Sequence, residues 1–341
     1  MKFLVFEFLS SNKYNYRAPL LNEGISMLKL ISEGLKRRGH EVFTMINSKL
    51  SVLVPNFNHI KIEKPMEFIE FLQFLEKTVN DFNIDYVFPI APDAELAEII
   101  SFCHSHEIKT VGSEPDAIRN TADKWKTYRI LNKKRLLQPR TFLLKNRDYH
   151  SIDFIDLPVV VKSRYGIGCE NLFLLDSESK FFNTIKNMNM GDMIIQEFID
   201  GIHASVILFS DGKKSKAVSL NKQYIKLSGN GSGYFGCRVP LEVEYSIKKR
   251  AFLLAENAVN YIGGLKGCIG VDIVIKRQKP YIIEINPRVT TSMIALEMAT
   301  DLNISNAALN AFFGVLPEIR EFRKEVELKI SESGIISFND S

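Results

Sequence analysis

Two acids and an asparagine lie on two short apolar runs in the stretch GVDIVIKRQKPYIIEINPR, residues 270–288. The runs are rich in Val, Ile and Tyr and flank a basic, turn-like cluster, so they predict a β-hairpin. A three-residue turn centred on Gln278 would place Asp272 opposite Glu284, with Asn286 one step further along the same face. Because Mg²⁺ prefers hard oxygen ligands, these side chains predict a divalent-metal site. A hairpin with acids on an exposed face is the alternative.

Two cations could hold phosphate near this hairpin. Arg288 follows the acids, where a guanidinium could bind a phosphoryl group that the metal also contacts. Lys162 ends the apolar run LPVVVK and either faces an anion or snorkels to the surface. Gly166 and Gly168 follow in SRYGIGCENL, where glycine lets the backbone approach phosphates closely. Lysine, glycine loop and returning strand together predict a flexible flap over a nucleotide.

A second nucleotide-binding segment is predicted in IIQEFIDG, residues 194–201. It runs from an apolar strand into polar positions that could offer backbone groups to an adenine edge and a carboxylate to its amino group or the ribose. A strand that ends in a turn is the alternative. The candidates here are Glu197, Phe198, Ile199 and Asp200.

Three further features join this set. Lys222 lies in SLNKQ, and Lys124, which alone would be read as an exposed helix lysine, lies in NTADKWKTYRIL. The loop SGNGSGYFG, residues 228–236, is rich in Gly and Asn and is expected to order over a bound ligand. No Ser/His/Asp, Cys/His or HExxH arrangement stands out, so nucleophilic catalysis by a side chain is not expected.

Composition indicates a globular protein of two or three lobes. The 341 residues are 45% hydrophobic and 25% charged, with a net charge of +4. The basic clusters fall on predicted helices, so no nucleic-acid partner is expected. Four cysteines without CxxC spacing argue against a zinc site or a disulfide framework and favour the cytoplasm. No run approaches the roughly twenty apolar residues of a membrane span, so no membrane partner is expected.

The elements that must position these residues fall into three regions and a tail. Residues 1–112 alternate strands and helices, as in a doubly wound parallel α/β domain with its crevice beyond the strands' carboxyl ends. In that crevice the polar segment SSNKYNY, without a GxGxxG, predicts a loop that touches a small substrate. A helix over 114–136 leads into antiparallel strands of an α+β region, divided into lobes at 113–197 and 198–318. Residues 319–341 are expected to form a peripheral tail.

In their order along residues 1–315, these motifs resemble those of the ATP-grasp ligases, and D…EINPR is the most specific part. The resemblance implies an N-terminal α/β domain and two α+β lobes that clasp ATP. It implies that Lys124 and Lys162 contact phosphates and adenine, and that Glu197 and the Ile199 backbone bind the adenine. It also implies that Mg²⁺ or Mn²⁺ is held by the three hairpin residues and that Arg288 steadies the transferred phosphoryl group. His203 departs from the pattern, which leaves Asp200 as the expected ribose partner.

The activity that the resemblance implies is ATP-dependent joining of a carboxylate to an amine through an acyl phosphate. The motifs MKFLVFEF, Glu23-Gly24, HASVILFSDGK and SLNKQ are similar to those of members that join the γ-carboxylate of L-glutamate to tyramine in methanofuran biosynthesis. The expected lids are residues 164–169 and 228–236, and the candidates for binding the amine are Glu7, Tyr14, Tyr16 and Tyr234. Alternatives are an ATP-grasp ligase for other amino acids or amines, a carboxylase, and a nucleotide-binding protein without turnover. The expected partners are small-molecule substrates and a second copy of the chain in a homodimer.

Overall fold

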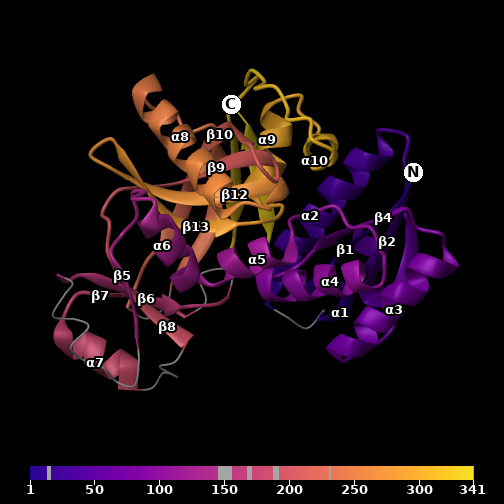
Figure 1. Ribbon diagram of the computed structural model, residues 1–341, viewed down its shortest axis with the longest axis horizontal. Helices are drawn as coiled ribbons and strands as arrows, with labels where there is room; N and C mark the ends of the chain where they lie inside the picture. Colours follow the sequence, from indigo (N-terminus) through magenta and orange to yellow (C-terminus); the bar gives the residue numbers. More distant parts are fainter. Residues whose placement is uncertain (14–16, 145–155, 167–170, 187–191, 230–231, 341) are drawn as a thin grey trace.

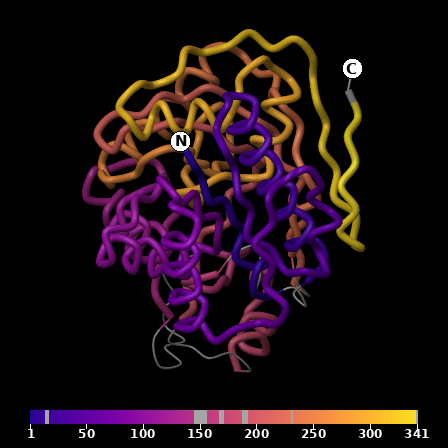
Figure 2. Tube along the Cα trace, turned by 90° about the vertical axis from the view of Figure 1, so that its right-hand side faces the viewer, coloured from indigo at the N-terminus to yellow at the C-terminus, as the bar shows by residue number. Residues whose placement is uncertain are grey.

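The computed structural model describes residues 1–13, 17–144, 156–166, 171–186, 192–229 and 232–340 (Figures 1 and 2). The N-terminal domain has a four-stranded parallel sheet in the order β3-β2-β1-β4. Its strands are β1 (Lys2–Glu7), β2 (Glu41–Asn47), β3 (Asn58–Ile62) and β4 (Tyr86–Ile90). Its helices are α1 (Phe8–Asn12), α2 (Ala18–Lys36), the 3-10 turn η1 (Ser48–Leu53), α3 (Phe68–Asp81) and α4 (Asp93–Ser105). The predicted parallel α/β architecture is confirmed.

The first crevice segment differs from the predicted loop. Its start folds into α1, because the Glu7 carboxylate caps the helix by accepting hydrogen bonds from the backbone N–H of Leu9 and of Ser10. The cap is provided by the acid at the end of β1. The sequence did not predict this helix, because five residues are too few to show helical spacing of apolar side chains. Tyr14 and Tyr16 lie outside the described residues.

The single helix predicted over 114–136 is wrong. Two helices stand there, α5 (Pro115–Ala122) and α6 (Lys124–Lys133), because Asp123 is extended, with φ −92° and ψ 98°. Its side chain caps α6 by accepting from the N–H of Trp125 and of Lys126. Ala117 and Leu131 are buried in the core of the C-terminal lobe, so these helices pack with that lobe although the boundary at 113 placed them in the central one.

The central lobe is a four-stranded antiparallel sheet in the order β5-β8-β6-β7. Its strands are β5 (Thr141–Leu143), β6 (Val159–Ser163), β7 (Leu172–Leu175) and β8 (Met193–Glu197), and α7 (Glu178–Lys186) packs on them. Figure 1 shows this lobe standing apart from the N-terminal domain. It is therefore joined to the rest of the molecule mainly through the C-terminal lobe.

The C-terminal lobe contains a seven-stranded sheet in the order β13-β12-β9-β10-β11-β14-β15. Its strands are β9 (Ile202–Asp211), β10 (Ser215–Lys226), β11 (Gly233–Val239), β12 (Lys266–Lys276), β13 (Lys279–Asn286), β14 (Val326–Ile330) and β15 (Ile336–Asp340). Its helices are α8 (Tyr245–Ile262), α9 (Ser292–Ala299) and α10 (Ile304–Phe312). The predicted peripheral tail is thus part of the sheet: Val326 and Leu328 are fully buried, because they pair with β11 and face α9.

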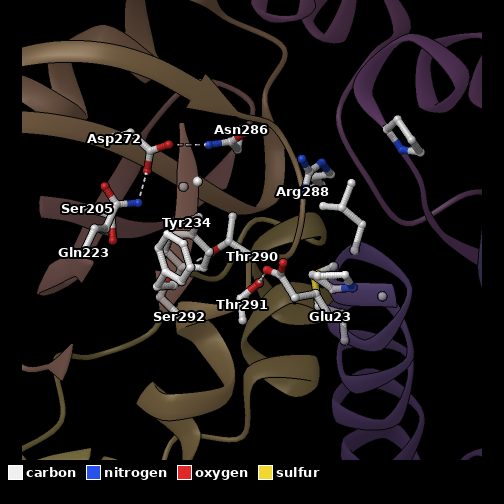
Figure 3. A pocket seen from close by; sticks show the side chains of 18 of the residues that line it. Glu23, Ser205, Gln223, Tyr234, Asp272, Asn286, Arg288, Thr290, Thr291 and Ser292 are labelled. Atoms are coloured by element: carbon white, nitrogen blue, oxygen red, sulfur yellow. Dashed lines mark hydrogen bonds between the residues drawn. The ribbon is translucent and has the colours of Figure 1, made fainter. Parts of the chain in front are cut away.

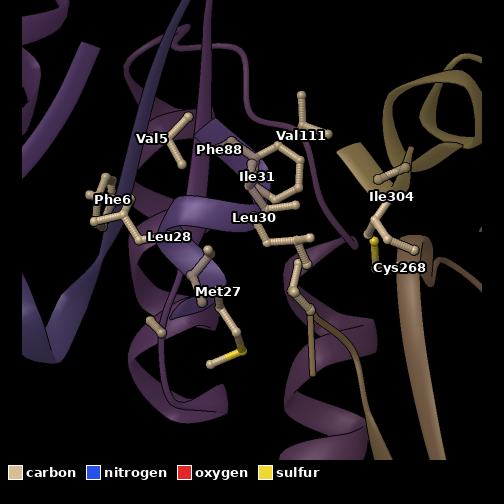
Figure 4. Packing of buried hydrophobic residues seen from close by; sticks show 14 of the residues in the cluster. Val5, Phe6, Met27, Leu28, Leu30, Ile31, Phe88, Val111, Cys268 and Ile304 are labelled. Atoms are coloured by element: carbon tan, nitrogen blue, oxygen red, sulfur yellow. The ribbon is translucent and has the colours of Figure 1, made fainter. Parts of the chain in front are cut away.

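One continuous core joins the N-terminal domain to the C-terminal lobe. Figure 4 shows Leu30 and Ile31 of α2 and Val111 close to Cys268 and Ile304 of the other lobe. Ser305 of α10 also donates to the backbone oxygens of Leu30 and Ile31. A fully packed interface of this kind holds the two units in one orientation. The cavity between them therefore has fixed walls.

Candidate active site

The acid-bearing hairpin has the predicted pairing but not the predicted turn. Asp272 lies opposite Glu284, and Gly270 lies opposite Asn286. The turn has two residues, Arg277 and Gln278, with φ of 46° and 64°, as tight hairpins require. A shift in register after Asp272 adds one residue to β13, and this bulge restores the pair that a three-residue turn would have given.

Asp272 is held by amides. Gln223 Nε2 donates to its Oδ1 at 2.8 Å, and Asn286 Nδ2 donates to its Oδ2 at 3.2 Å. Burial and, to a smaller extent, the nearby Glu284 charge raise the pKa of Asp272 to about 7, against those hydrogen bonds. A divalent cation between the two acids would favour their ionised forms. Gln223 was missed by the sequence analysis, since an amide on a strand carries no signal of its own.

The donor set fits Mg²⁺. In the described part of the chain, no group of three His, Cys, Asp or Glu side chains could hold a metal ion. The candidate site has instead two carboxylates and the Asn286 amide. Mg²⁺ takes one or two carboxylates and completes its octahedron with water and phosphate oxygens. Asp272, Glu284 and Asn286 satisfy that requirement.

Lys124 connects the hairpin to the glycine flap. Its Nζ lies 3.3 Å from Glu284 Oε1 and donates to the Gly166 carbonyl at 3.0 Å. The side chain is 11% exposed, so it is not the surface lysine that its helix alone would suggest. The following flap residue Gly168 lies outside the described residues.

The start of the flap is anchored at the break between α5 and α6. Arg164 Nε donates to Asp123 Oδ1 at 2.7 Å, and the Tyr165 hydroxyl donates to Asp123 Oδ2 at 3.3 Å. The same carboxylate caps α6, which carries Lys124. One buried acid therefore fixes both the flap and the lysine that reaches the hairpin.

A cavity of about 100 Å³ separates the central lobe from the C-terminal lobe. Lys162 lines it and is only 4% exposed. Its other lining groups include apolar side chains from both lobes, the segment Glu197–Ile199, and the acids Asp272 and Glu284. An apolar slot with a lysine inside and acids at its end offers contacts for an aromatic base, for phosphate and for a phosphate-bound metal ion.

The remaining predicted nucleotide residues are only partly in this slot: Glu197 lines it, whereas Asp200 and Lys222 do not. The Glu197 carboxylate accepts from Arg140 Nε at 3.3 Å and is partly committed to that pair. Asp200 is exposed beside His203, whose pKa burial lowers. Lys222 lines a separate hollow, with its ammonium 5.6 Å from the centre of the Tyr224 ring.

A second cavity, of about 380 Å³, lies between the N-terminal domain and the C-terminal lobe. Figure 3 shows Glu23 of α2 near Thr291 and Arg288, with Tyr234 across from them and Asp272 and Asn286 further along. The two cavities share Asp272 and Glu284 among their lining residues. The acid pair therefore lies where the smaller cavity, called the slot below, meets the larger one, called the chamber.

Arg288 is fixed within this chamber. Its Nε donates to Asp93 Oδ1 at 2.8 Å, and the two side chains are 16% and 10% exposed. Burial raises the pKa of Asp93, while the guanidinium opposes that shift. Asp93 begins α4 directly after β4, the position where a doubly wound sheet binds its ligand. Arg288 was among the predicted residues and Asp93 was not, because only the fold brings the two together.

In the sequence pair Glu23-Gly24, the glycine is needed because it packs against the Glu7 side chain. A Cβ on Gly24 would lie 2.5 Å from Glu7 Oε2, so a larger residue there would displace the buried Glu7 side chain. The Glu7 pKa is raised by burial, against the N–H groups that its carboxylate caps. Glu7, predicted as an amine contact, therefore has a structural role at the chamber wall.

The loop over residues 228–236 is shorter than predicted. Gly233 onwards belongs to β11, and residues 230–231 lie outside the described residues. Before them, the Ser228 carbonyl accepts from the N–H of Leu174 in β7 at 3.1 Å. This loop thus reaches from the chamber to the central lobe.

Among the helices that the structure describes, none is long and apolar enough to span a bilayer.

Comparisons with known proteins agree with this geometry. Residues 121–292 match the family model described as ATP-grasp domain. The tyramine–L-glutamate ligase of Methanocaldococcus jannaschii is 30% identical over 89% of this chain and 88% of its own. Among solved structures, the L-amino acid ligase of Bacillus licheniformis has a TM-score of 0.73 at 17% identity, over 97% of this chain and 80% of that one.

A further solved structure is the biotin carboxylase domain of a Hydrogenobacter thermophilus 2-oxoglutarate carboxylase, crystallised with MgADP. It has a TM-score of 0.76 at 16% identity and covers 96% of this chain and 74% of that one. Together the relatives support the predicted fold and the predicted ATP-dependent ligation of a carboxylate to an amine. The chain belongs to the ATP-grasp family.

Proposed function

We propose that this ligase joins the γ-carboxylate of L-glutamate to tyramine, with Mg²⁺ and ATP, and releases ADP and phosphate. The relatives named tyramine–L-glutamate ligase, at 30% and 31% identity, support this choice of substrates. The observation that carries the proposal is the position of Asp272 and Glu284 at the junction of the two cavities. A phosphoryl group at that junction can pass from a nucleotide on one side to a carboxylate on the other.

The nucleotide would occupy the slot between the central lobe and the C-terminal lobe. Its base would rest against apolar side chains and the backbone at Phe198 and Ile199, and Asp200 would face the ribose. Lys162 and Lys124 would neutralise the phosphates, and on ATP binding Lys124 would exchange Glu284 for a phosphate oxygen. Gly166, Gly168 and Lys222 are proposed as further contacts at its edges.

When bound on Asp272, Glu284 and Asn286, Mg²⁺ or Mn²⁺ would supply charge neutralisation and in-line orientation of the phosphates. Arg288 would hold the oxygens of the transferring group from the chamber side, because Asp93 fixes its guanidinium. The flap and the loop at 228–236 would keep water from the acyl phosphate. The chain's own task is therefore to position the reactants and exclude solvent.

The test is ADP release by the purified protein with ATP, Mg²⁺ and a panel of amino acids paired with amines. Stimulation that requires both glutamate and tyramine, with the amide identified by mass spectrometry, is expected. Stimulation by a pair of amino acids, as for a dipeptide ligase, would replace the substrates and keep the class. Bicarbonate-dependent ADP release without an amine would instead indicate a carboxylase.

A further inference from the structure

The acids that line the chamber differ in their hydrogen-bond and ion-pair partners. Glu7 accepts two backbone N–H bonds at 3.1 and 2.8 Å, and Asp272 and Glu284 belong to the candidate metal site. Glu332 is exposed at the rim. Glu23 differs, because its carboxylate accepts a hydrogen bond from Thr291 Oγ1 and forms no ion pair with a basic side chain among the described residues. It is the chamber's acid with capacity left for a cationic ligand.

The position of Glu23 suits the second substrate. Thr291 fixes one carboxylate oxygen and lies three residues after Arg288, so Glu23 faces the region where the activated carboxylate would lie. The apolar side chains of the chamber wall include Leu20 and Met27 from α2 and Ile90 from the end of β4. An acid beside an apolar wall matches an ammonium group on a short aromatic chain.

Resting on the proposed function, we infer that Glu23 binds the ammonium group of the incoming arylalkyl amine and accepts its proton. One proton moves from the ammonium to the Glu23 carboxylate, and the freed nitrogen lone pair attacks the γ-carbonyl carbon of the acyl phosphate. The carbon–oxygen bond to phosphate then breaks as the amide forms. The second nitrogen proton leaves with phosphate as hydrogen phosphate, so atoms and charge balance.

The surroundings of Glu23 support proton transfer near neutrality. Burial raises the pKa of Glu23 to about 7, against the Thr291 hydrogen bond and the charge of Arg288. Tyr234 and Cys237 of β11 also face Glu23, and burial raises the pKa of both; Arg17 at the start of α2 lines the same cavity. A base with a pKa near the working pH is the most effective proton acceptor.

The experiment separates activation of the carboxylate from use of the amine. Wild-type protein, Glu23→Gln and Glu33→Gln are assayed with ATP, Mg²⁺ and glutamate, first with tyramine and then with hydroxylamine. Hydroxylamine is mostly uncharged at neutral pH and needs neither an ammonium site nor a base. Glu33 lies on the same helix but is exposed outside the chamber, so its variant is the matched control.

Glu23→Gln is expected to lose about 100-fold or more in amide formation with tyramine, in the range of a lost general base, and far less in hydroxamate formation. The limb of kcat/KM for tyramine that rises towards pH 7 should also disappear. Thr291→Val, which removes only the bond that positions Glu23, should lose less. Glu33→Gln should match wild type in both assays.

Three results would overturn the inference. Full amide formation by Glu23→Gln would remove its role, and equal losses of amide and hydroxamate would assign Glu23 to the glutamate ammonium or to the fold. A wild-type enzyme that forms no hydroxamate from glutamate would refute the proposed carboxylate substrate itself, and this inference with it. The failure of each claim is therefore distinguishable.

Discussion

Arg288 and Asp93 provide a test in which stability and turnover separate. Their ion pair is 2.8 Å long, and both side chains are largely buried. Removing one partner of a buried pair leaves an uncompensated charge and costs about 3–5 kcal/mol of stability. Arg288→Met should therefore lower the free energy of unfolding by about this amount because Asp93 remains buried. It should also raise the barrier to phosphoryl transfer by about 3–4 kcal/mol, a loss of several hundredfold in turnover.

The double variant Asp93→Asn/Arg288→Met removes both charges, so the stability penalty should largely disappear. Turnover should not recover, because the guanidinium is still missing. Asp93→Asn alone should keep the charge of Arg288 but loosen its position, and should lose activity by a smaller factor.

The assays are urea unfolding followed by circular dichroism, and ADP release with saturating ATP, glutamate and tyramine. Turnover by the double variant near the wild-type level would refute the reasoning, since Arg288 would then serve only to neutralise Asp93. Unchanged stability in Arg288→Met would show that the pair is not buried as described.

Three further predictions concern the hairpin, the flap and the chamber. Glu284→Gln should lose most turnover yet fold normally, because the residue lies on a paired strand and the substitution removes only a charge. Circular dichroism checks the fold and ADP release checks turnover. Unchanged amide formation would contradict the metal role. Asp123→Ala should cost about 1 kcal/mol of stability through the lost cap and raise the KM for ATP. Asp123→Asn should keep the cap and lose only the negative charge that pairs with Arg164. Equal KM values in wild type and Asp123→Ala would count against the flap anchor. The folded chain holds more protons at Glu23 than the unfolded chain between its ordinary pKa of 4.5 and about 7, so its stability contribution falls as pH rises through that window. Glu23→Gln should accordingly raise the melting temperature more at pH 8 than at pH 5, and an equal change at both would show that Glu23 titrates normally.

The local patterns of the sequence carried much of this architecture. Strand patterns that alternate with helix patterns in residues 1–112 predicted the parallel sheet. The Asp272–Glu284 pairing was predicted from the alternation of side chains along each strand. The pairing was nevertheless predicted through the wrong turn, since a bulge and a shorter loop give the same register. A bulge depends on how β12 also packs against β9, which no local pattern contains.

The missing parts of the site are long-range contacts. Asp93 with Arg288, Glu23 with Thr291 and Gln223 with Asp272 join segments that are 49 to 268 residues apart. Each of those side chains is ordinary in its own segment, and only the packed interface between domains makes it part of a site. The same reason explains the tail, where β14 and β15 are strands because β11 offers them an edge. The homodimer stays a prediction, for which sedimentation analysis is the test.

The central claim is that ATP phosphorylates a carboxylate on the enzyme before the amine attacks. The most direct measurement uses glutamate with ¹⁸O in its γ-carboxylate, together with ATP, Mg²⁺ and tyramine, followed by mass spectrometry of the released phosphate. The account predicts one ¹⁸O atom transferred to phosphate for each amide formed, with ADP as the other product. Unlabelled phosphate, or AMP and pyrophosphate in its place, would contradict it.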